Sequence, residues 1–208
     1  IASSLVGSEM CIRDSFSSAP DYETKSSYIA TVTASDGTNS ATQNITVSIT
    51  DVDDVAPVFT SSSTFSAAEN QTSIGTVTAT DVDSSSISFS VSGSDLSMTT
   101  SGVLSFVSAP YYETKSSYTA TVTASDGTNS STQNITVNVT NVNDNTPSIT
   151  SSSTFSAAEN QTSIGTVTAT DADGDTLTYS LSGTDASSMT IGSSSGVLAF
   201  SSAPDYET

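Results

Sequence analysis

The sequence predicts an all-β chain of tandem seven-stranded Greek-key β-sandwiches, and three observations support this prediction. Long segments recur at a fixed spacing, apolar and polar residues alternate in short stretches, and no stretch has a helical period. The segment Ser61–Asp81 recurs unchanged as Ser151–Asp171, an offset of 90 residues (151 − 61). A repeat of about this length with evenly spaced turns is typical of one such sandwich.

The repeats also predict the domain organisation. Ser18–Tyr28 recurs at Ser108–Tyr118, again offset by 90 residues (108 − 18), and a third copy begins at Ser202, offset by 94 (202 − 108). The third repeat therefore has four additional residues. We expect the C-terminal part of a first repeat at 16–57, a complete second repeat at 58–147, and the N-terminal part of a third at 148–208.

Residues 1–15 match no repeat and contain the lone Cys11 and the lone Arg13. Their sequence resembles translated sequencing adapter joined to a gene fragment, and a divergent natural terminus is the alternative. The start of the chain has no basic residues followed by a long apolar run, so we expect an internal fragment of a longer protein.

Seven short strands are expected in the second repeat, because apolar residues alternate there with Ser and Thr. The Asp126-Gly127 pair between the last two predicts a hairpin turn. In chain order the predicted strands contain Phe65 and Ala67; Val77 and Ala79; Ile87, Phe89 and Val91; Leu96–Met98; Leu104 and Phe106; Tyr118, Ala120 and Val122; Ile135, Val137 and Val139.

Composition excludes several classes of function. Three basic residues stand against 22 acidic ones, a formal net charge of −19, and His is absent. This balance argues against binding to nucleic acid or to an anionic membrane surface. No apolar stretch approaches the about 20 residues of a membrane span. Without His no base is evident that could activate a serine, so we expect no enzyme and no catalytic residues.

Thin cores are expected, because only 34% of the residues are hydrophobic. A single cysteine forms no internal disulfide. A bound metal is the remaining common way to stabilise a weak core. Two segments rich in side-chain oxygens, Asp51–Pro57 and Thr140–Pro147, are suited to a hard cation such as calcium, which takes six to eight oxygen ligands. Taken alone, Asp126 is better explained as a turn former.

Five motifs recur in a fixed order from Phe16 onward: A-E-N at Ala68–Asn70, D-x-D at Asp81 and Asp83, D-Y-E at Asp21–Glu23, A-S-D-G at Ala124–Gly127, and a linker similar to D-x-N-D-N-x-P at Asn141–Pro147. In this the chain resembles cadherin repeats, whose sandwiches have an immunoglobulin-like architecture. Its serine-rich, nearly lysine-free composition is more similar to bacterial cell-surface adhesins than to animal junction cadherins.

The resemblance implies three calcium ions (Ca2+) at each of two repeat junctions. At the first junction it implies the ligands Asp21, Glu23, Asp51, Asp53, Asp54, Asp81, Asp83 and Asp126. At the second it implies Glu69, Glu113, Asn143, Asp144, Asp171 and Asp173.

The sequence departs from the family pattern at the junctions. Tyr111 stands where the D-Y-E motif has its first acid, and Asn141 stands where the linker has its first acid. Asp53 and Val55 replace the usual linker asparagines. The first junction has eight carboxylates and the second has five, so we expect the second to fill later and to flex more at low calcium.

These patterns predict calcium-binding repeats of an extracellular adhesion protein at a cell surface. The expected partners are calcium and either another cadherin-like chain, a homophilic copy included, or a cell-surface ligand. The alternative is a spacer or carbohydrate-binding module of a secreted enzyme, and the absence of Trp disfavours it. Because the outer repeats lack strands, we also expect the isolated chain to associate head to tail.

Overall fold

The computed structural model describes residues 16–84 and 86–207, so the segment 1–15 lies outside the described residues. Strands dominate this part of the chain, and the only helical element in it is one 3-10 turn, η1 (Ala186–Ser188). Among the described residues, no helix has the length and apolar content needed to span a membrane. The all-β prediction is confirmed.

The strands are short, apart from two long hairpins. They are β1 (Ser27–Ser35), β2 (Ser40–Ser48), β3 (Val58–Phe59), β4 (Thr64–Ala68), β5 (Ser73–Thr76), β6 (Ala79–Thr80), β7 (Ser88–Val91), β8 (Leu96–Met98), β9 (Val103–Phe106), β10 (Ser117–Ser125), β11 (Ser130–Thr140), β12 (Ser148–Ile149), β13 (Ser163–Thr166), β14 (Ala169–Thr170), β15 (Met189–Ile191) and β16 (Val197–Phe200).

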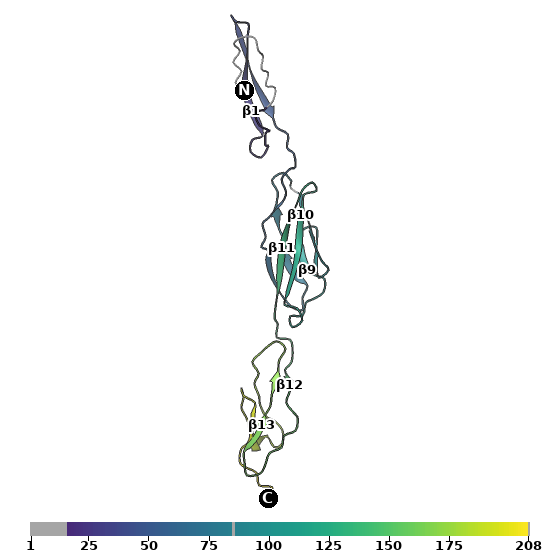
Figure 1. Ribbon diagram of the computed structural model, residues 1–208, viewed down its shortest axis with the longest axis vertical. Coiled ribbons are helices and arrows are strands. Elements are labelled where there is room, and N and C mark those ends of the chain that lie inside the picture. The colour runs from purple at the N-terminus through teal and green to yellow at the C-terminus, as the bar shows by residue number, and fades with distance from the viewer. Residues whose placement is uncertain (1–15, 85, 208) are drawn as a thin grey trace. The chain divides into compact units, whose positions relative to one another are not determined.

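The predicted second repeat contains a four-stranded sheet, β4-β11-β10-β7, and a three-stranded sheet, β5-β9-β8. Figure 1 shows β10 and β11 as long neighbouring strands. A small sheet, β3-β6, accompanies them, and β12-β14 and β13-β16-β15 repeat part of this order later in the chain. The neighbours β5 and β9 are not consecutive in sequence, which is the crossover that a Greek key requires.

The described residues fall into two compact units. One holds 16–65, 73–107 and 119–136, and the other holds 66–72, 108–118 and 137–207. Each unit contains one of the two oxygen-rich segments, 51–57 or 140–147. The units do not follow the 90-residue period, and the predicted repeat boundaries stay a prediction.

The predicted second strand proves to be two strands, because Val77 lies between β5 and β6. The Val77 amide donates to the Gly102 carbonyl at 2.9 Å, one residue beyond the Thr76–Val103 pair that ends the β5-β9 ladder. Gly102 has φ of 90°, and a Cβ there would lie 2.3 Å from the Val77 carbonyl oxygen. Only glycine tolerates this approach. Ile87 lies just outside β7, and β3 was not predicted.

A small apolar core stabilises the first unit. Val77, Leu104 and Val122 are 0% exposed, and Ile135 is 1% exposed. All four are predicted inward positions of alternating strands. The β1-β2 hairpin has nearly the same sequence as the β10-β11 pair, but its Val32 is 47% exposed. Strand sequence alone therefore does not determine burial.

This difference yields a matched pair of substitutions. Val122→Ala removes fully buried methyl groups, and we expect it to lower the free energy of unfolding by about 2 kcal/mol. Val32→Ala removes half-exposed methyl groups, and we expect it to change the free energy of unfolding by less than about 0.5 kcal/mol. Chemical denaturation monitored by circular dichroism measures both. Equal effects of the two substitutions would contradict the placement of the core.

Candidate metal centres

Two carboxylate trios meet in the first unit. Carboxylate oxygens of Glu23, Asp51 and Asp83 lie within 4.8 Å of one another, and so do those of Asp53, Asp81 and Asp83. Asp83 belongs to both trios. The two trios therefore form one continuous acidic site, which we call the first junction. It unites the linker 51–57 with the segment that follows β6.

Backbone amides orient the acids after β6. Asp81 Oδ1 accepts hydrogen bonds from the amides of Asp83 at 2.9 Å and Ser84 at 2.8 Å. Asp83 Oδ2 accepts from the linker amides of Asp54 at 3.1 Å and Val55 at 2.8 Å. The other oxygens, Asp81 Oδ2 and Asp83 Oδ1, are buried and have no hydrogen-bond partner.

The two carboxylate oxygens of Asp126 have different environments. Its Oδ1 accepts hydrogen bonds from the Thr128 amide at 2.7 Å and the Asn129 amide at 2.6 Å, which close the loop between β10 and β11. The turn interpretation is thus right for this oxygen. Its Oδ2 is buried without a partner. The Asn129 side chain donates to the Asp53 carbonyl at 3.1 Å and links this loop to the first junction.

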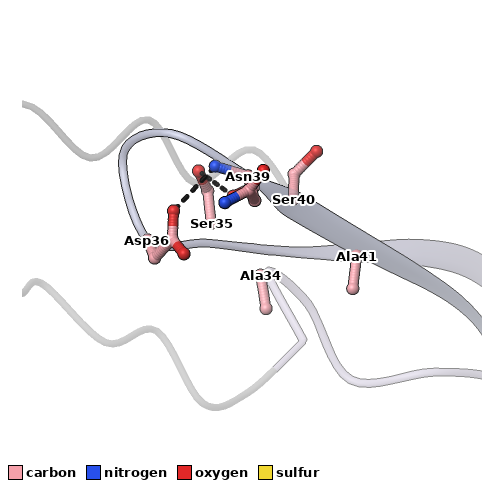
Figure 2. A pocket seen from close by; sticks show the side chains of 6 residues that line it. All are labelled: Ala34, Ser35, Asp36, Asn39, Ser40 and Ala41. Atoms are coloured by element: carbon pink, nitrogen blue, oxygen red, sulfur yellow. Dashed lines mark hydrogen bonds between the residues drawn. The ribbon is translucent and has the colours of Figure 1, made fainter.

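The β1-β2 hairpin has the same loop. Figure 2 shows Asp36 turned toward Asn39 across this loop, and Asp36 Oδ1 accepts from the Asn39 amide at 2.7 Å. Hydrogen bonds from the amides of Asn39 and Thr38 lower the pKa of Asp36. The loop geometry therefore follows from the Asp-Gly sequence in both hairpins.

The second unit contains a corresponding acidic site, the second junction. Carboxylate oxygens of Glu69, Glu113, Asp144 and Asp173 lie within 4.8 Å of one another. Four segments bring them together: the residue after β4, the loop before β10, the linker 141–147, and the segment that follows β14. Both Glu113 carboxylate oxygens are buried without a hydrogen-bond partner.

Glu69 is the anchor of the second junction. It is only 2% exposed, and it is the only charged residue among the described ones that is buried to this degree. Its Oε1 accepts from the Val142 amide and its Oε2 from the Tyr112 amide, both at 2.8 Å. Asn70, at φ of 63°, turns the chain directly after it. Glu69 thus fixes the linker to the loop before β10.

Asp173 accepts hydrogen bonds from two backbone amides of the linker 141–147, as Asp83 does from the linker 51–57. Its Oδ2 accepts from the amides of Asp144 at 3.1 Å and Asn145 at 2.8 Å. Asp171 lies with Asp173 and Asp175 in another cluster within 4.8 Å. Asp175 was not predicted, although the spacing D-A-D-G-D extends the D-x-D motif.

Three more predicted ligands lie outside the carboxylate clusters of the described structure. Asp21 accepts from the Thr24 amide at 3.2 Å and the Thr24 hydroxyl at 3.0 Å, and these bonds lower its pKa. Asp54 contributes its backbone amide to Asp83. Asn143 is exposed. Their role as metal ligands, like that of the other predicted residues, stays a prediction.

A further acidic cluster was missed. Glu159, Asp205 and Glu207 have carboxylate oxygens within 4.8 Å of one another, and the Tyr206 amide donates to Glu159 Oε2 at 3.0 Å. These residues are the recurring copies of the A-E-N and D-Y-E motifs, so the repeat period was a signal that could have revealed the cluster.

Crowding of carboxylates shifts several pKa values. The backbone amide of Glu23 lowers its pKa, but partial burial and the neighbouring Asp83 and Asp21 outweigh this and raise it to about 7. Burial, followed by Asp173 and Glu69, raises the pKa of Glu113. Burial by itself would raise the pKa of Asp173, but hydrogen bonds from Asn145 outweigh this effect and lower the pKa. The junctions thus carry charge that lacks a counterion.

A pH dependence follows for the cation-free chain. Because the pKa of Glu23 is raised from 4.5 to about 7, the folded chain binds more protons than the unfolded chain. Its contribution to stability is fully present below pH 4.5 and is lost as pH rises through about 7. We expect the melting temperature in chelator to fall over this window, and Glu23→Gln to flatten the fall.

The control for this prediction is Asp185→Asn, which removes an acid outside the clusters. Thermal melting followed by circular dichroism over this pH range compares the three chains. A Glu23→Gln chain with the parent's full pH dependence would contradict the assignment of the shift to Glu23.

Comparison with known proteins agrees with this architecture. No family model matches the chain. It is 32% identical over 178 residues to mouse Cadherin EGF LAG seven-pass G-type receptor 1, and 33% identical over 170 residues to the human protein of that name. Each match covers 74% of this chain but spans only 6% of the relative.

Solved structures are similar over nearly the whole chain. The mouse cadherin-23 EC22-24 structure has a TM-score of 0.73 and 28% identity, and the match covers 92% of this chain and 69% of that one. The protocadherin gammaB7 EC3-6 structure has a TM-score of 0.76 and 27% identity over 90% and 55% of the two chains. The sheet order, the recurring motifs and these matches together show that the chain contains cadherin repeats and belongs to that family.

Proposed function

We propose that the chain is a calcium-binding segment of an extracellular adhesion protein, in which calcium stabilises the two junctions. The observation that carries the proposal is a set of buried carboxylate oxygens without hydrogen-bond partners. They belong to Asp81, Asp83, Glu113 and Asp126, four residues that the motifs single out. A buried carboxylate without a partner is costly, so a group that satisfies it is expected.

The chemistry of the donors favours calcium. Both junctions offer carboxylate, amide and carbonyl oxygens, and the chain has no His and only one Cys. Calcium takes six to eight oxygen ligands in flexible geometry. Zinc and copper prefer the nitrogen and sulfur ligands that these sites lack. The residues present therefore fit calcium.

Asp83 and Asp173 have the central role in this proposal. Each already holds the adjoining linker through one carboxylate oxygen, and each contributes to two carboxylate clusters. Glu23, Asp51, Asp53 and Asp81 would complete the site around Asp83. Bound calcium would neutralise the mutual repulsion of these acids, and the linker 51–57 would then stay bonded to Asp83.

The repeats belong to a family of adhesion proteins, and we propose adhesion for this chain as well. The proposed partner is another cadherin-like chain or a cell-surface ligand, and the proposed location is outside the cell. The chain has no His that could activate a serine, and we propose no catalytic role for it. The bacterial origin stays a prediction from composition.

Calcium should therefore raise thermal stability. At 100 times its dissociation constant, calcium stabilises the folded chain by about 2.7 kcal/mol for each independent site. We expect a higher melting temperature in millimolar calcium than in chelator, and Asp83→Asn should reduce the difference. Differential scanning calorimetry measures it.

Two controls separate site binding from general screening. Magnesium at the same concentration has the same charge but demands small octahedral geometry, so we expect a smaller shift. Asp185→Asn removes one acid away from the junctions and should leave the calcium response intact. An unchanged melting temperature between chelator and calcium would refute the proposal.

A further inference from the structure

The two junctions differ at several equivalent positions, and three of these differences concern hydrogen bonds around the linker 141–147. Tyr111 replaces Asp21, Asn141 replaces Asp51, and Asn145 replaces Val55, all at the 90-residue offset. In each case the second junction has a side chain that can donate a hydrogen bond, and the first has an acid or an apolar group. The structure shows what these donors contact.

Asn145 lies between two carboxylates. Its Nδ2 donates to Asp144 Oδ1 and to Asp173 Oδ1, each at 2.8 Å, and its Oδ1 accepts from the Tyr111 hydroxyl. Asn141 Nδ2 donates to the Asp173 carbonyl at 2.8 Å. A neutral amide thus satisfies one acid of the linker and one acid of the segment that follows β14. Hydrogen bonds to charged groups are stronger than neutral ones.

Among the described residues, no such group reaches Asp83 at the first junction, although the Asn129 side chain donates to Asp53 Oδ1 there at 3.3 Å. Val55 has no side-chain donor, and Asp21 in the place of Tyr111 is itself an acceptor that is bonded to Thr24. The consequence is visible at Asp83 Oδ1, the counterpart of Asp173 Oδ1, which is buried without a partner. The backbone bonds are nevertheless the same, because Asp54 and Val55 donate to Asp83 Oδ2 at 3.1 and 2.8 Å.

We propose that Asn145 and Tyr111 form a hydrogen-bond clasp that holds the linker 141–147 to Asp173 without a cation. The second junction then keeps its geometry when calcium is withdrawn, and the first junction loses its geometry. The part that concerns calcium rests on the proposed function. The clasp reverses the expectation from charge counting that the second junction flexes more at low calcium.

The clasp also bears on calcium binding at the second junction. Asp144 and Asp173 use the same oxygens for Asn145 that a cation would need, so calcium has to displace the amide. Calcium should therefore bind the second junction more weakly than the first, in line with its smaller number of acids. The two junctions would respond over separate ranges of calcium concentration.

The test is residue-resolved amide hydrogen exchange by NMR on the full chain in excess chelator. The amides of Asp144 and Asn145 are matched with those of Asp54 and Val55, because each pair donates to one aspartate at the same two distances. We expect the Asp144 and Asn145 amides to be roughly tenfold or more better protected from exchange than the Asp54 and Val55 amides. A factor of ten corresponds to about 1.4 kcal/mol. The Val139 amide, bonded to the Ser116 carbonyl at 2.9 Å, reports whether the second unit is folded.

Asn145→Val gives the second junction the residue of the first. We expect it to lower the protection of the Asp144 amide roughly tenfold while the Val139 amide keeps its protection. Tyr111→Phe removes only the hydroxyl and should lower the protection of the Asp144 amide roughly threefold. This variant provides a second test if the Asn145→Val chain unfolds. The double variant Asp21→Tyr/Val55→Asn should raise protection of the Asp54 amide.

Equal exchange of the two amide pairs in chelator would overturn the clasp, and so would unchanged Asp144 protection in both the Asn145→Val and Tyr111→Phe chains. A parallel series in saturating calcium keeps this result distinct from the proposed function. If calcium leaves the Asp54 and Val55 amides unprotected, the calcium proposal fails, while the comparison in chelator still decides the clasp.

Discussion

Repulsion between carboxylates is the constraint on which the junctions depend. The chain has 22 acidic residues and three basic ones. The two lysines are used elsewhere: Lys25 lies 4.3 Å from the centre of the Tyr28 ring, and Lys115 lies 4.0 Å from that of Tyr118. The clustered acids must therefore be balanced by backbone amides, neutral side-chain donors, protons or a metal ion. The described structure shows the first two of these directly, and the raised pKa of Glu23 indicates the third.

The β-sheets place the acids where this balance is needed. Alternation along β10 and β11 buries small apolar side chains such as Val122 and Val137, and the polar residues remain outside. Acids stand in the turns and linkers that begin where the alternation ends. A core this small contributes little stability to spare. Interactions at the junctions are therefore a large share of what keeps each unit folded.

Local sequence predicted the strands well and their environment poorly. The alternation around Tyr118–Val122 and the Asp126-Gly127 turn were sufficient to predict β10 and the loop that follows it. By contrast, 64–68 and 154–158 have the same sequence, yet only the first is a strand. Its neighbour is β11, and the described residues provide no equivalent neighbour for 154–158. Glu69 is accordingly buried and Glu159 exposed, a difference that requires knowledge of the tertiary pairing.

The candidate sites show the same division between local and long-range information. Motifs predicted most of the acids that meet, but not the donors that satisfy them, because Asn145 and Asp173 are far apart in sequence. The backbone frame is the same at both junctions, since Asp83 and Asp173 each accept two linker amides at 3.1 and 2.8 Å. Side chains that differ between the two linkers then decide how the remaining oxygens are balanced. A repeat can therefore keep its geometry while a few substitutions change its dependence on a cation.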